Sequence, residues 1–429
     1  MPAAPQFQSE FLRTFVARGA FYACSEPAAE LDALFERERV TAYIGFDCTA
    51  KSMHIGNLVQ LMTLRRLQQA GHKPILLMGG GTTKAGDPSG KDETRLILTP
   101  QQIGENKQSM LGGVRHLLKF GTGPSDAIMV DNADWLDRLE YIPFLREVGR
   151  HFSVNRMLTM DSVRLRLERD QALSFLEFNY SIMQAYDFVE LNKRFGCRLQ
   201  SAGSDQWGNI ISGIELGRRM ARPQLFGLTT PLITTASGAK MGKTAAGAVW
   251  LNQDMFSVYD YWQFWRNTED GDVGRFLRLF TDIPEPEIAR LEKLAGAELN
   301  DAKKKLADEA TAILHGREAA EKARETAEQA FERGIASADL PIYEMDWSAG
   351  EVTGEHGWTE RRAEAILKAS TLATSLSDAR RKIAEKAVRI NDKLVARHDD
   401  WFKKTDVDPQ TGAFKVQYGR KKIVLVRPI

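Results

Sequence analysis

The segment that decides the fold is YIGFDCTAKSMHIGNLVQLMTLRRL, residues 43–67. The apolar run at 42–46 predicts a buried strand, and the second half of the segment carries Leu and Met at helical spacing. A second apolar run follows at 75–78. These elements predict a β–α–β unit of the nucleotide-binding kind. Such units bind anions where a strand ends and a helix starts, because free backbone N–H groups point there. His54 and Asn57 occupy that position.

The sequence beyond this segment continues the alternation of strands and helices. Further strands are predicted within residues 127–135, 197–209 and 226–234, and a long helical region is predicted over 141–194. This alternation favours a parallel sheet covered by helices, which is the α/β class. Beyond residue 254 strong helix formers dominate the sequence.

The tail has a different pattern, with two short helices followed by strands at 414–419 and 421–427 around a turn. Composition and pattern together divide the chain into four expected parts. These are an α/β domain over 1–250, an α-helical domain over 251–334, a linker over 335–355 and a small basic α+β domain over 356–429.

Charge is distributed unevenly along the chain. The net charge is +1, but residues 356–429 carry 17 Lys and Arg against 9 Asp and Glu, so the first 355 residues are net negative. A compact basic segment favours a phosphate-rich partner such as nucleic acid or an anionic membrane face. The plainer alternative is a solvated surface without a partner.

Cysteine usage and the N-terminus bear on the compartment. Cys24, Cys48 and Cys197 are too far apart for a metal site or a disulfide framework. The first residues include Glu10 and Arg13 and lack the apolar run of a signal peptide or membrane span. We therefore expect a cytoplasmic protein that does not enter a membrane.

Two loops pair Gly with Lys but fail the phosphate-loop pattern, because Ala85 and Ser237 stand where glycine is required. A dinucleotide fingerprint fails at Lys84. What remains is a set of strand-end loops that carry one histidine and several cations: His54, Lys91, Arg95, Lys240 and Lys243. Singly, each is more often a solvated charge. Together they suit phosphoryl or nucleotidyl transfer, which needs orientation and charge neutralisation more than a protein nucleophile.

The pairing of HIGN at 54–57 with KMGKT at 240–244 resembles the two signature motifs of class I aminoacyl-tRNA synthetases. Four further motifs make the whole chain similar to the bacterial tyrosyl-tRNA synthetase family. They are GFDCTA at 45–50, GDPSGK at 86–91, SFLEFNYSIMQAYDF at 174–188 and GSDQWGN at 203–209.

The resemblance implies a Rossmann-like catalytic domain, an α-helical domain and an alpha-L RNA-binding tail, in a homodimer to which the apolar residues near Phe175 and Phe178 contribute. The implied substrates are L-tyrosine, ATP with Mg²⁺, and tRNA(Tyr). No resident metal is implied. Residues implied in catalysis are His54, Asn57 and Thr49 at the ATP phosphates, Lys240, Lys243 and Thr244 in one mobile loop, and Lys91 and Arg95 in another. Those implied in binding the nucleotide are Gly45, Asp47, Gly56, Gly203, Asp205, Leu232 and Ile233.

The tyrosine pocket implied by the resemblance consists of Tyr43, Asp87, Tyr180, Gln184, Asp187 and Gln206. Tyr43 and Asp187 would bind the phenol, and Asp87, Tyr180 and Gln184 the ammonium group. The spacing of 180, 184 and 187 puts these three side chains on one helix face. The alternative for Tyr180 is a core aromatic.

Some positions depart from the family pattern. Asn57 replaces a second histidine, Cys48 a proline, and Thr83–Lys84–Ala85 a more apolar stretch, while Ala202 stands where glycine is usual. Rival readings are another nucleotidyltransferase, a tryptophan-specific relative, or a non-catalytic RNA-binding protein with this fold. The candidate phenol partners and the retained motif lysines favour the tyrosine enzyme.

Overall fold

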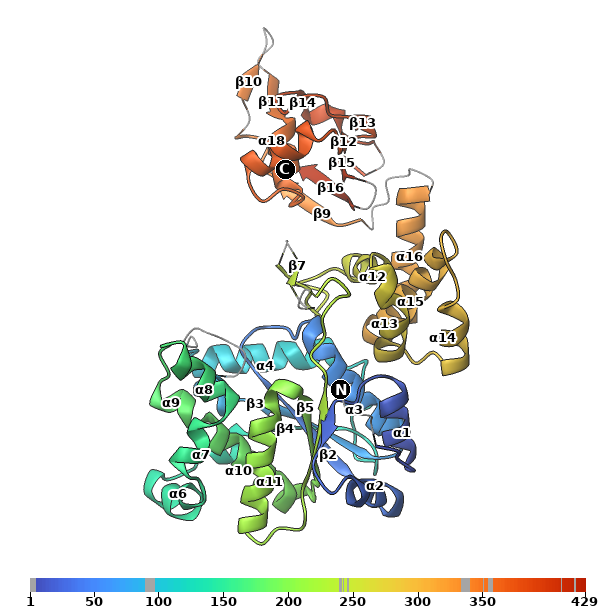
Figure 1. Ribbon diagram of the computed structural model, residues 1–429. Coiled ribbons are helices and arrows are strands. Elements are labelled where there is room, and N and C mark those ends of the chain that lie inside the picture. Colours follow the sequence, from blue (N-terminus) through green and yellow to red (C-terminus); the bar gives the residue numbers. More distant parts are fainter. Residues whose placement is uncertain are drawn as a thin grey trace. The chain divides into compact units, whose positions relative to one another are not determined.

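The computed structural model describes residues 5–88, 97–238, 241, 243–244, 247–332, 340–349, 351–353, 358–409, 411–419 and 422–429 (Figure 1). By its internal contacts the chain forms two compact units. The first comprises residues 1–243, 248–255 and 274–289, and the second comprises 244–247, 256–273 and 290–429. The first unit thus includes a segment beyond the 1–250 boundary expected from the sequence.

The first unit is built on a six-stranded sheet of order β1-β6-β5-β2-β3-β4. Its strands are β1 (Ala23–Cys24), β2 (Thr41–Asp47), β3 (Lys73–Gly79), β4 (Ile128–Asp131), β5 (Leu199–Gly203) and β6 (Phe226–Thr230). All neighbours are parallel except the pair β1 and β6. The predicted α/β class is therefore confirmed, and the sheet contains each strand expected from the sequence.

The connections of this sheet explain where a ligand would bind. From β2 the chain runs outward to β3 and β4, then returns to the other side of β2 to form β5 and β6. The direction of winding thus changes between β2 and β5. In open α/β sheets, ligands bind outside the carboxyl ends of the strands at such a switch point. Asp47 ends β2, and Gly203 ends β5.

Helices cover the sheet in the first unit (Figure 1). They are α1 (Glu10–Ala17), α2 (Ala28–Arg37), α3 (Ile55–Gln69), α4 (Pro100–Val114), α5 (Ala133–Leu136), α6 (Tyr141–Glu147), α7 (Val154–Leu158), α8 (Asp161–Glu168), α9 (Phe175–Phe178), α10 (Tyr180–Phe195), α11 (Trp207–Arg219), most of α13 (Val273–Phe280) and the start of α14 (Glu285–Leu291). One buried cluster joins Tyr43, Ile75 and Leu77 of the sheet to Phe188 and Leu191 of α10. This contact fixes α10 over the strand that ends at Asp47.

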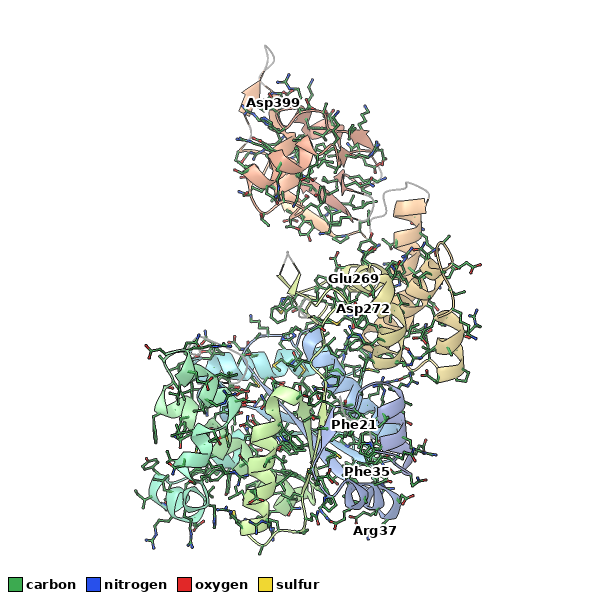
Figure 2. The ribbon with its side chains drawn as sticks, in the orientation of Figure 1. Phe21, Phe35, Arg37, Glu269, Asp272 and Asp399 are labelled. Atoms are coloured by element: carbon green, nitrogen blue, oxygen red, sulfur yellow. The ribbon has the colours of Figure 1, made fainter. Side chains whose placement is uncertain are left out.

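Aromatic side chains hold the N-terminal helices in place. Phe35, labelled in Figure 2, lies 4.9 Å from the ring of Phe11 and 4.7 Å from the ring of His72. Phe21, also labelled there, meets Phe7 edge-on at 5.7 Å. Such edge-on and tilted pairs add to the burial of apolar area. They join α1 and α2 to the segment that enters β3.

The helical region predicted over 141–194 is confirmed, but it consists of several helices. It is broken into α6, α7, α8, α9 and α10. Asp170, just after α8, has a positive φ of 52°, which does not continue a right-handed helix. Ser174 then caps α9 in a capping box with Glu177. Arg166 and Glu177 form a buried pair at 3.0 Å that holds the broken segment together.

The second unit contains helices and a separate β structure. Its helices are α12 (Val258–Arg266), α15 (Leu299–His315), α16 (Arg317–Glu332), α17 (Ala363–Ala369) and α18 (Leu376–Ala384). A sheet of order β13-β12-β15-β16-β9 contains β9 (Ile342–Met345), β12 (Val388–Ile390), β13 (Lys393–Leu394), β15 (Phe414–Tyr418) and β16 (Lys422–Pro428). A three-stranded sheet contains β10 (Glu351–Thr353), β11 (Trp358–Arg362) and β14 (Trp401–Lys403).

Two expectations about the tail meet different outcomes. The predicted hairpin is confirmed as the antiparallel pair β15 and β16. The predicted linker over 335–355 is wrong for Ile342–Met345, because this segment pairs in parallel with β16 and so completes the tail sheet. Trp347 stacks on Phe414 in the core of that sheet, with ring centroids 5.3 Å apart. Within the described residues, none of the helices is both long and apolar enough to span a membrane.

Candidate active site

His54 and Asn57 build the start of helix α3 from their own side chains. The Nδ1 atom of His54 accepts the N–H of Gly56 at 3.0 Å, and the side-chain oxygen of Asn57 accepts the N–H of His54 at 3.0 Å. This capping box fixes the first turn of the helix next to the end of β2. Since Nδ1 is an acceptor, the proton of a neutral imidazole lies on Nε2, which can donate to an anion.

Gly56 brings the two signature motifs into contact. A Cβ atom at this position would lie 2.7 Å from Cε1 of His54 and 3.4 Å from the carbonyl oxygen of Met241. The first distance excludes any side chain unless the imidazole moves. The second shows that Met241, from the KMGKT motif, lies against the turn of the HIGN motif.

Backbone hydrogen bonds hold the residues after the second motif to the first. The N–H of Ile55 donates to the carbonyl of Val249 at 2.8 Å, and the N–H of Leu251 donates to Met53 at 2.9 Å. The Ser52 hydroxyl accepts the N–H groups of Leu251 and Asn252 at 3.1 and 3.0 Å. The backbone next to the HIGN motif and the backbone after the KMGKT motif therefore lie side by side, as the two motifs predicted.

Several predicted catalytic residues lie outside this description. Lys91, Arg95 and Lys240 are not among the described residues, and for Lys243 and Thr244 only the backbone is described, as strand β7 (Lys243–Thr244). Thr49 is exposed in the turn between β2 and α3. The structure thus describes the backbone on both sides of the KMGKT motif, and the positions of the lysine side chains in this motif stay predictions.

The end of β2 contacts the start of α10. The hydroxyl of Tyr180 donates to Oδ2 of Asp47 at 3.0 Å, and Thr82 donates to Oδ1 at 2.8 Å. Burial and the nearby carboxylates of Asp47 and Asp87 raise the pKa of Tyr180 well above its ordinary value. Tyr180 therefore remains a neutral donor. Asp47 and Tyr180, which the resemblance assigns to different reactants, are direct partners.

A second pair lies between Asp87 and the loop after β5. The amide nitrogen of Gln206 donates to Asp87 at 2.8 Å, and Gln206 accepts from Asn209 at 2.9 Å. These bonds orient Gln206 with its nitrogen towards the carboxylate. A carboxylate held in this way is suited to an ammonium group.

Asp187 is the most deeply buried carboxylate of the candidate tyrosine site, with only 1% of its surface exposed. Asn132 donates to one carboxylate oxygen at 2.9 Å, and the indole N–H of Trp135 donates to the other at 2.7 Å. Burial raises the pKa of Asp187 to about 8, although both hydrogen bonds favour the charged form. Asp187 also helps to raise the pKa of the buried Tyr43, which places the two residues in one electrostatic environment.

Two pocket atoms are buried and have no hydrogen-bond partner among the described residues. They are the hydroxyl oxygen of Tyr43 and the side-chain oxygen of Gln184. An unsatisfied buried polar atom costs about 1–3 kcal/mol, so proteins rarely keep one without a reason. Both atoms belong to residues that the resemblance implies in tyrosine binding.

Some of the predicted nucleotide residues meet where β5 and β6 end. A Cβ atom on Gly203 would lie 2.6 Å from Oδ1 of Asp205 and 3.3 Å from Cδ2 of Leu232, so these three residues are in contact. The carbonyl of Ile233 accepts the N–H of Met241 at 3.0 Å. Gly45 differs from the rest, because a Cβ there would make only an ordinary contact with Leu77 at 3.7 Å.

Sequence reasoning missed Thr82, Asn132 and Trp135. Asn132 follows the end of β4 directly, and its side-chain oxygen also accepts the N–H of Gly81 at 2.8 Å. The strand-end rule that selected His54 after β2 would have selected Asn132 after β4. No signal in the sequence pairs Trp135 with Asp187.

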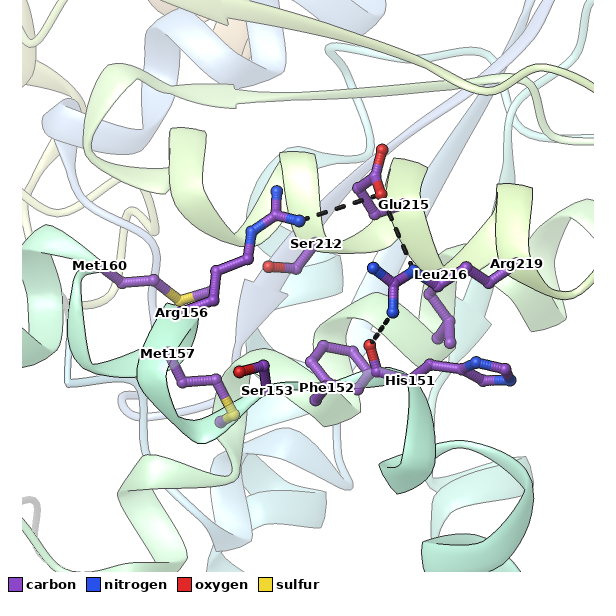
Figure 3. A pocket seen from close by; sticks show the side chains of 10 residues that line it. All are labelled: His151, Phe152, Ser153, Arg156, Met157, Met160, Ser212, Glu215, Leu216 and Arg219. Carbon is purple, nitrogen blue, oxygen red and sulfur yellow. Dashed lines mark hydrogen bonds and ion pairs between the residues drawn. The ribbon is translucent and has the colours of Figure 1, made fainter.

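Two cavities in the first unit lie apart from these residues. One, of about 40 Å³, is lined by His151, Phe152, Ser153, Arg156, Met157, Met160, Ser212, Glu215, Leu216 and Arg219 (Figure 3). It has room for only a few waters and is too small for a reactant. A wider cleft of about 370 Å³ lies near the amino ends of β2 and β5. Its Arg39 and Arg198 donate to the carbonyls of Gly71 and Gln224. These cations therefore bind the backbone just before β3 and β6.

The parallel sheet, the capped turn at its switch point and the paired motifs define a nucleotide-using enzyme of the class I synthetase type. Residues 36–332 match the family model described as tRNA synthetases class I (W and Y). This range covers both motifs and all the pocket residues.

Relatives narrow the class further. The chain is 56% identical to the tyrosine–tRNA ligase of Bradyrhizobium diazoefficiens, over 98% of this chain and 99% of the relative. It is 57% identical to that of Caulobacter sp. strain K31, over the full length of both. A crystal structure of a C-terminally truncated Aspergillus nidulans mitochondrial tyrosyl-tRNA synthetase matches with a TM-score of 0.68 and 29% identity, over 76% of this chain and 95% of that one. The chain belongs to the tyrosine–tRNA ligase family.

Proposed function

We propose that the chain activates L-tyrosine with ATP, giving tyrosyl-adenylate and pyrophosphate, and then transfers tyrosine to the 3′-terminal ribose of tRNA(Tyr). The observation that carries the proposal is the buried polar pocket around Asp187 and Tyr43. Its buried acceptor and donor groups suit the hydroxyl of a phenol. A tryptophan-specific relative is the nearest alternative, because the family model covers both amino acids.

Tyrosine selection would depend on Tyr43 and Asp187. The phenol hydroxyl would donate to the Asp187 carboxylate and meet the buried hydroxyl of Tyr43, which has no partner among the described residues. Phenylalanine would leave both groups buried and unsatisfied, so the site would reject it strongly. The carboxylate of Asp87, with Tyr180 and Gln184, would hold the ammonium group, and Gln206 would orient Asp87.

Adenylate formation would proceed by in-line attack. The tyrosine carboxylate attacks the α-phosphorus of ATP and pyrophosphate leaves, so the protein needs only to orient the reactants and stabilise the developing charge. His54 would donate from Nε2 to the phosphates, with Thr49 and the amide nitrogen of Asn57 beside it. Lys91, Arg95, Lys240, Lys243 and Thr244 would hold pyrophosphate in the transition state. The nucleotide would be lined by Gly45, Asp47, Gly56, Gly203, Asp205, Leu232 and Ile233.

Magnesium would enter with ATP. Within the described part of the chain there is no group of three His, Cys, Asp or Glu side chains that could hold a metal ion. Mg²⁺ is commonly held by substrate phosphates and water with few protein ligands. We therefore expect Mg²⁺ to be carried by the phosphates of ATP.

The basic tail would bind tRNA. Its charge excess suits the phosphate backbone, and tRNA affinity would fall steeply as salt is raised. We assign the alpha-L RNA-binding role to the domain that begins at β9. The catalytic role belongs to the first unit.

A homodimer is supported by apolar side chains between β4 and α10. Phe175 is 68% exposed, Tyr141 63% and Ile142 60%. Large exposed apolar side chains grouped in one segment indicate a protein contact. A second copy of the chain is the partner that the family resemblance implies.

ATP–pyrophosphate exchange with each amino acid in turn tests the function. We expect exchange with tyrosine alone. Exchange that depends on tryptophan would replace the assignment, and exchange with neither would favour a non-catalytic RNA-binding protein.

The role of His54 is tested in the same assay with two variants. His54→Asn keeps a good helix cap and removes the imidazole, whereas His54→Ala removes both. Both should lower the exchange rate by at least about tenfold and leave tyrosine binding near wild type. A loss of tyrosine binding with intact exchange would contradict the assigned role.

A further inference from the structure

Arg275 connects helix α13 to the base of the second signature loop. Its guanidinium donates to the backbone carbonyl of Thr234. Thr234 lies between strand β6 and the segment that carries Lys240 and Lys243. Ile233, one residue earlier, accepts the N–H of Met241. The Arg275 contact therefore lies where the chain leaves the sheet to form the loop.

Helix α13 is itself held at its other end by arginines from the sheet unit. The Arg66 guanidinium donates to the carbonyls of Arg278 and Leu279, both at 2.6 Å. Arg18 donates to the carbonyl of Thr281 at 3.1 Å. Carbonyls at a helix C-terminus have no partner within the helix. Cations there also interact favourably with the negative end of the helix dipole. Both arginines thus satisfy groups that would otherwise be unpaired.

Arg66 lies on α3, the helix that begins with the HIGN turn. Its side chain is buried, and burial lowers its pKa to about 9. Below pH 9 it is still a cation, so its two hydrogen bonds to carbonyls are charge-assisted. Phe276, Leu277 and Phe280 of α13 are also buried. The helix that presents Arg275 is therefore fixed to the helix of the first motif by the two Arg66 hydrogen bonds.

We propose that Arg275 is a positioning residue for the second signature loop. It holds the Thr234 carbonyl on a helix fixed to α3, so the segment carrying Lys240 and Lys243 starts from a set position relative to His54. This inference rests on the proposed function, in which those lysines stabilise pyrophosphate in the transition state. A displacement of about 1 Å in such groups can lower a rate by about 10²-fold.

A merely structural role would have a different signature. The hydrogen bond of Arg275 is exposed, so water can replace the lost donor in a variant and the effect on folding stability should be small. The tyrosine pocket does not include α13. Loss of Arg275 should therefore change the rate of adenylate formation and leave tyrosine affinity unchanged.

The test compares Arg275→Ala and Arg275→Lys with Arg278→Ala in the full-length protein. Arg278 is on the same helix, and its guanidinium pairs with Glu285 at 2.6 Å. The measurements are kcat and KM for ATP in pyrophosphate exchange, the tyrosine dissociation constant and the melting temperature. The wild-type protein is measured first. If it shows no tyrosine-dependent exchange, the proposed function itself is refuted; if it does, the variants test the role of Arg275.

We expect Arg275→Ala to lower kcat at least about tenfold with tyrosine affinity within about twofold of wild type. Arg275→Lys should recover part of the rate, because an ammonium group can still donate to the carbonyl. Arg278→Ala should remain near wild type. The inference is overturned if Arg275→Ala matches Arg278→Ala in kcat, or if its loss of rate follows a parallel loss of tyrosine binding or melting temperature.

Discussion

The backbone N–H of Cys48 donates to the side-chain oxygen of Thr83 at 2.7 Å. Both positions depart from the pattern that the family resemblance implies, since proline is usual at the first and an apolar stretch at the second. Proline has no N–H and would not need this acceptor. The two departures therefore complement each other. Asn106 donates to the Cys48 carbonyl at 2.9 Å and fixes the same turn from the other side.

Thr83→Val should destabilise the protein by about 1–3 kcal/mol, because it leaves a buried N–H without an acceptor. Adding Cys48→Pro should recover part of this loss, since it removes the orphaned donor. Denaturant unfolding of both single variants and the double variant measures the coupling. Additive effects would mean that the hydrogen bond does not link the two positions.

Asn57 should show separate effects on folding and chemistry. Asn57→Ala removes the oxygen that accepts the His54 N–H and should cost about 1 kcal/mol of stability. Asn57→Asp keeps an acceptor there but adds negative charge near the proposed phosphate site. We therefore expect Asp to retain stability and to lower the exchange rate more than Ala does. Thermal melts and exchange kinetics check the two halves, and a faster Asp variant would place the phosphates elsewhere.

Tyrosine binding should strengthen as pH rises towards 8. Asp187 has its pKa raised to about 8 by burial, and its ionised form is the one that accepts the substrate phenol. Below that pKa each pH unit should change the dissociation constant by up to about tenfold. The stability of the free protein should change in the opposite sense. Because the pKa is raised on folding, the stability that Asp187 contributes at low pH is lost as pH rises through about 4 to 8.

Asp187→Asn is the matched control for the pH dependence, because it cannot titrate, and its binding should vary little between pH 6 and 8. Trp135→Phe removes a donor that favours the charged carboxylate. Its binding profile should shift to higher pH. Equilibrium dialysis of tyrosine measures all three proteins, and a pH-independent wild type would contradict the proposed role of ionised Asp187.

Removal of the tail should separate the two steps of the reaction. A chain ending at Glu332 lacks the whole tail sheet and should keep pyrophosphate exchange while losing tRNA charging. A chain ending at residue 355 keeps β9 without its partner β16, leaving an unpaired strand that favours aggregation. Light scattering should distinguish the two shortened chains. Normal charging by the first would refute the assignment of tRNA binding to the tail.

The sequence predicted best those elements whose structure is set by residues close together in the chain. Periodicity identified β2, α3 and β3, and the spacing of 180, 184 and 187 correctly indicated one helix, α10. Failures came from contacts between distant residues. Asp187 meets Asn132 and Trp135 across more than 50 positions, and Tyr180 meets Asp47 across 133. The strand β9 was mistaken for linker because four residues flanked by Asp, Ser and Gly carry no period of their own.

The parallel pairing of β9 with β16 has a consequence for how the protein folds. Ile342 pairs with Leu425, about 80 positions along the chain, whereas the hairpin of β15 and β16 closes over a short turn. Long loops must lose more chain entropy before their contacts form, so β9 should join the tail sheet last. Hydrogen exchange should then find the β9 amides opening more readily than those of β15. The proposed tRNA-binding domain would thus be complete only after its N-terminal strand has paired.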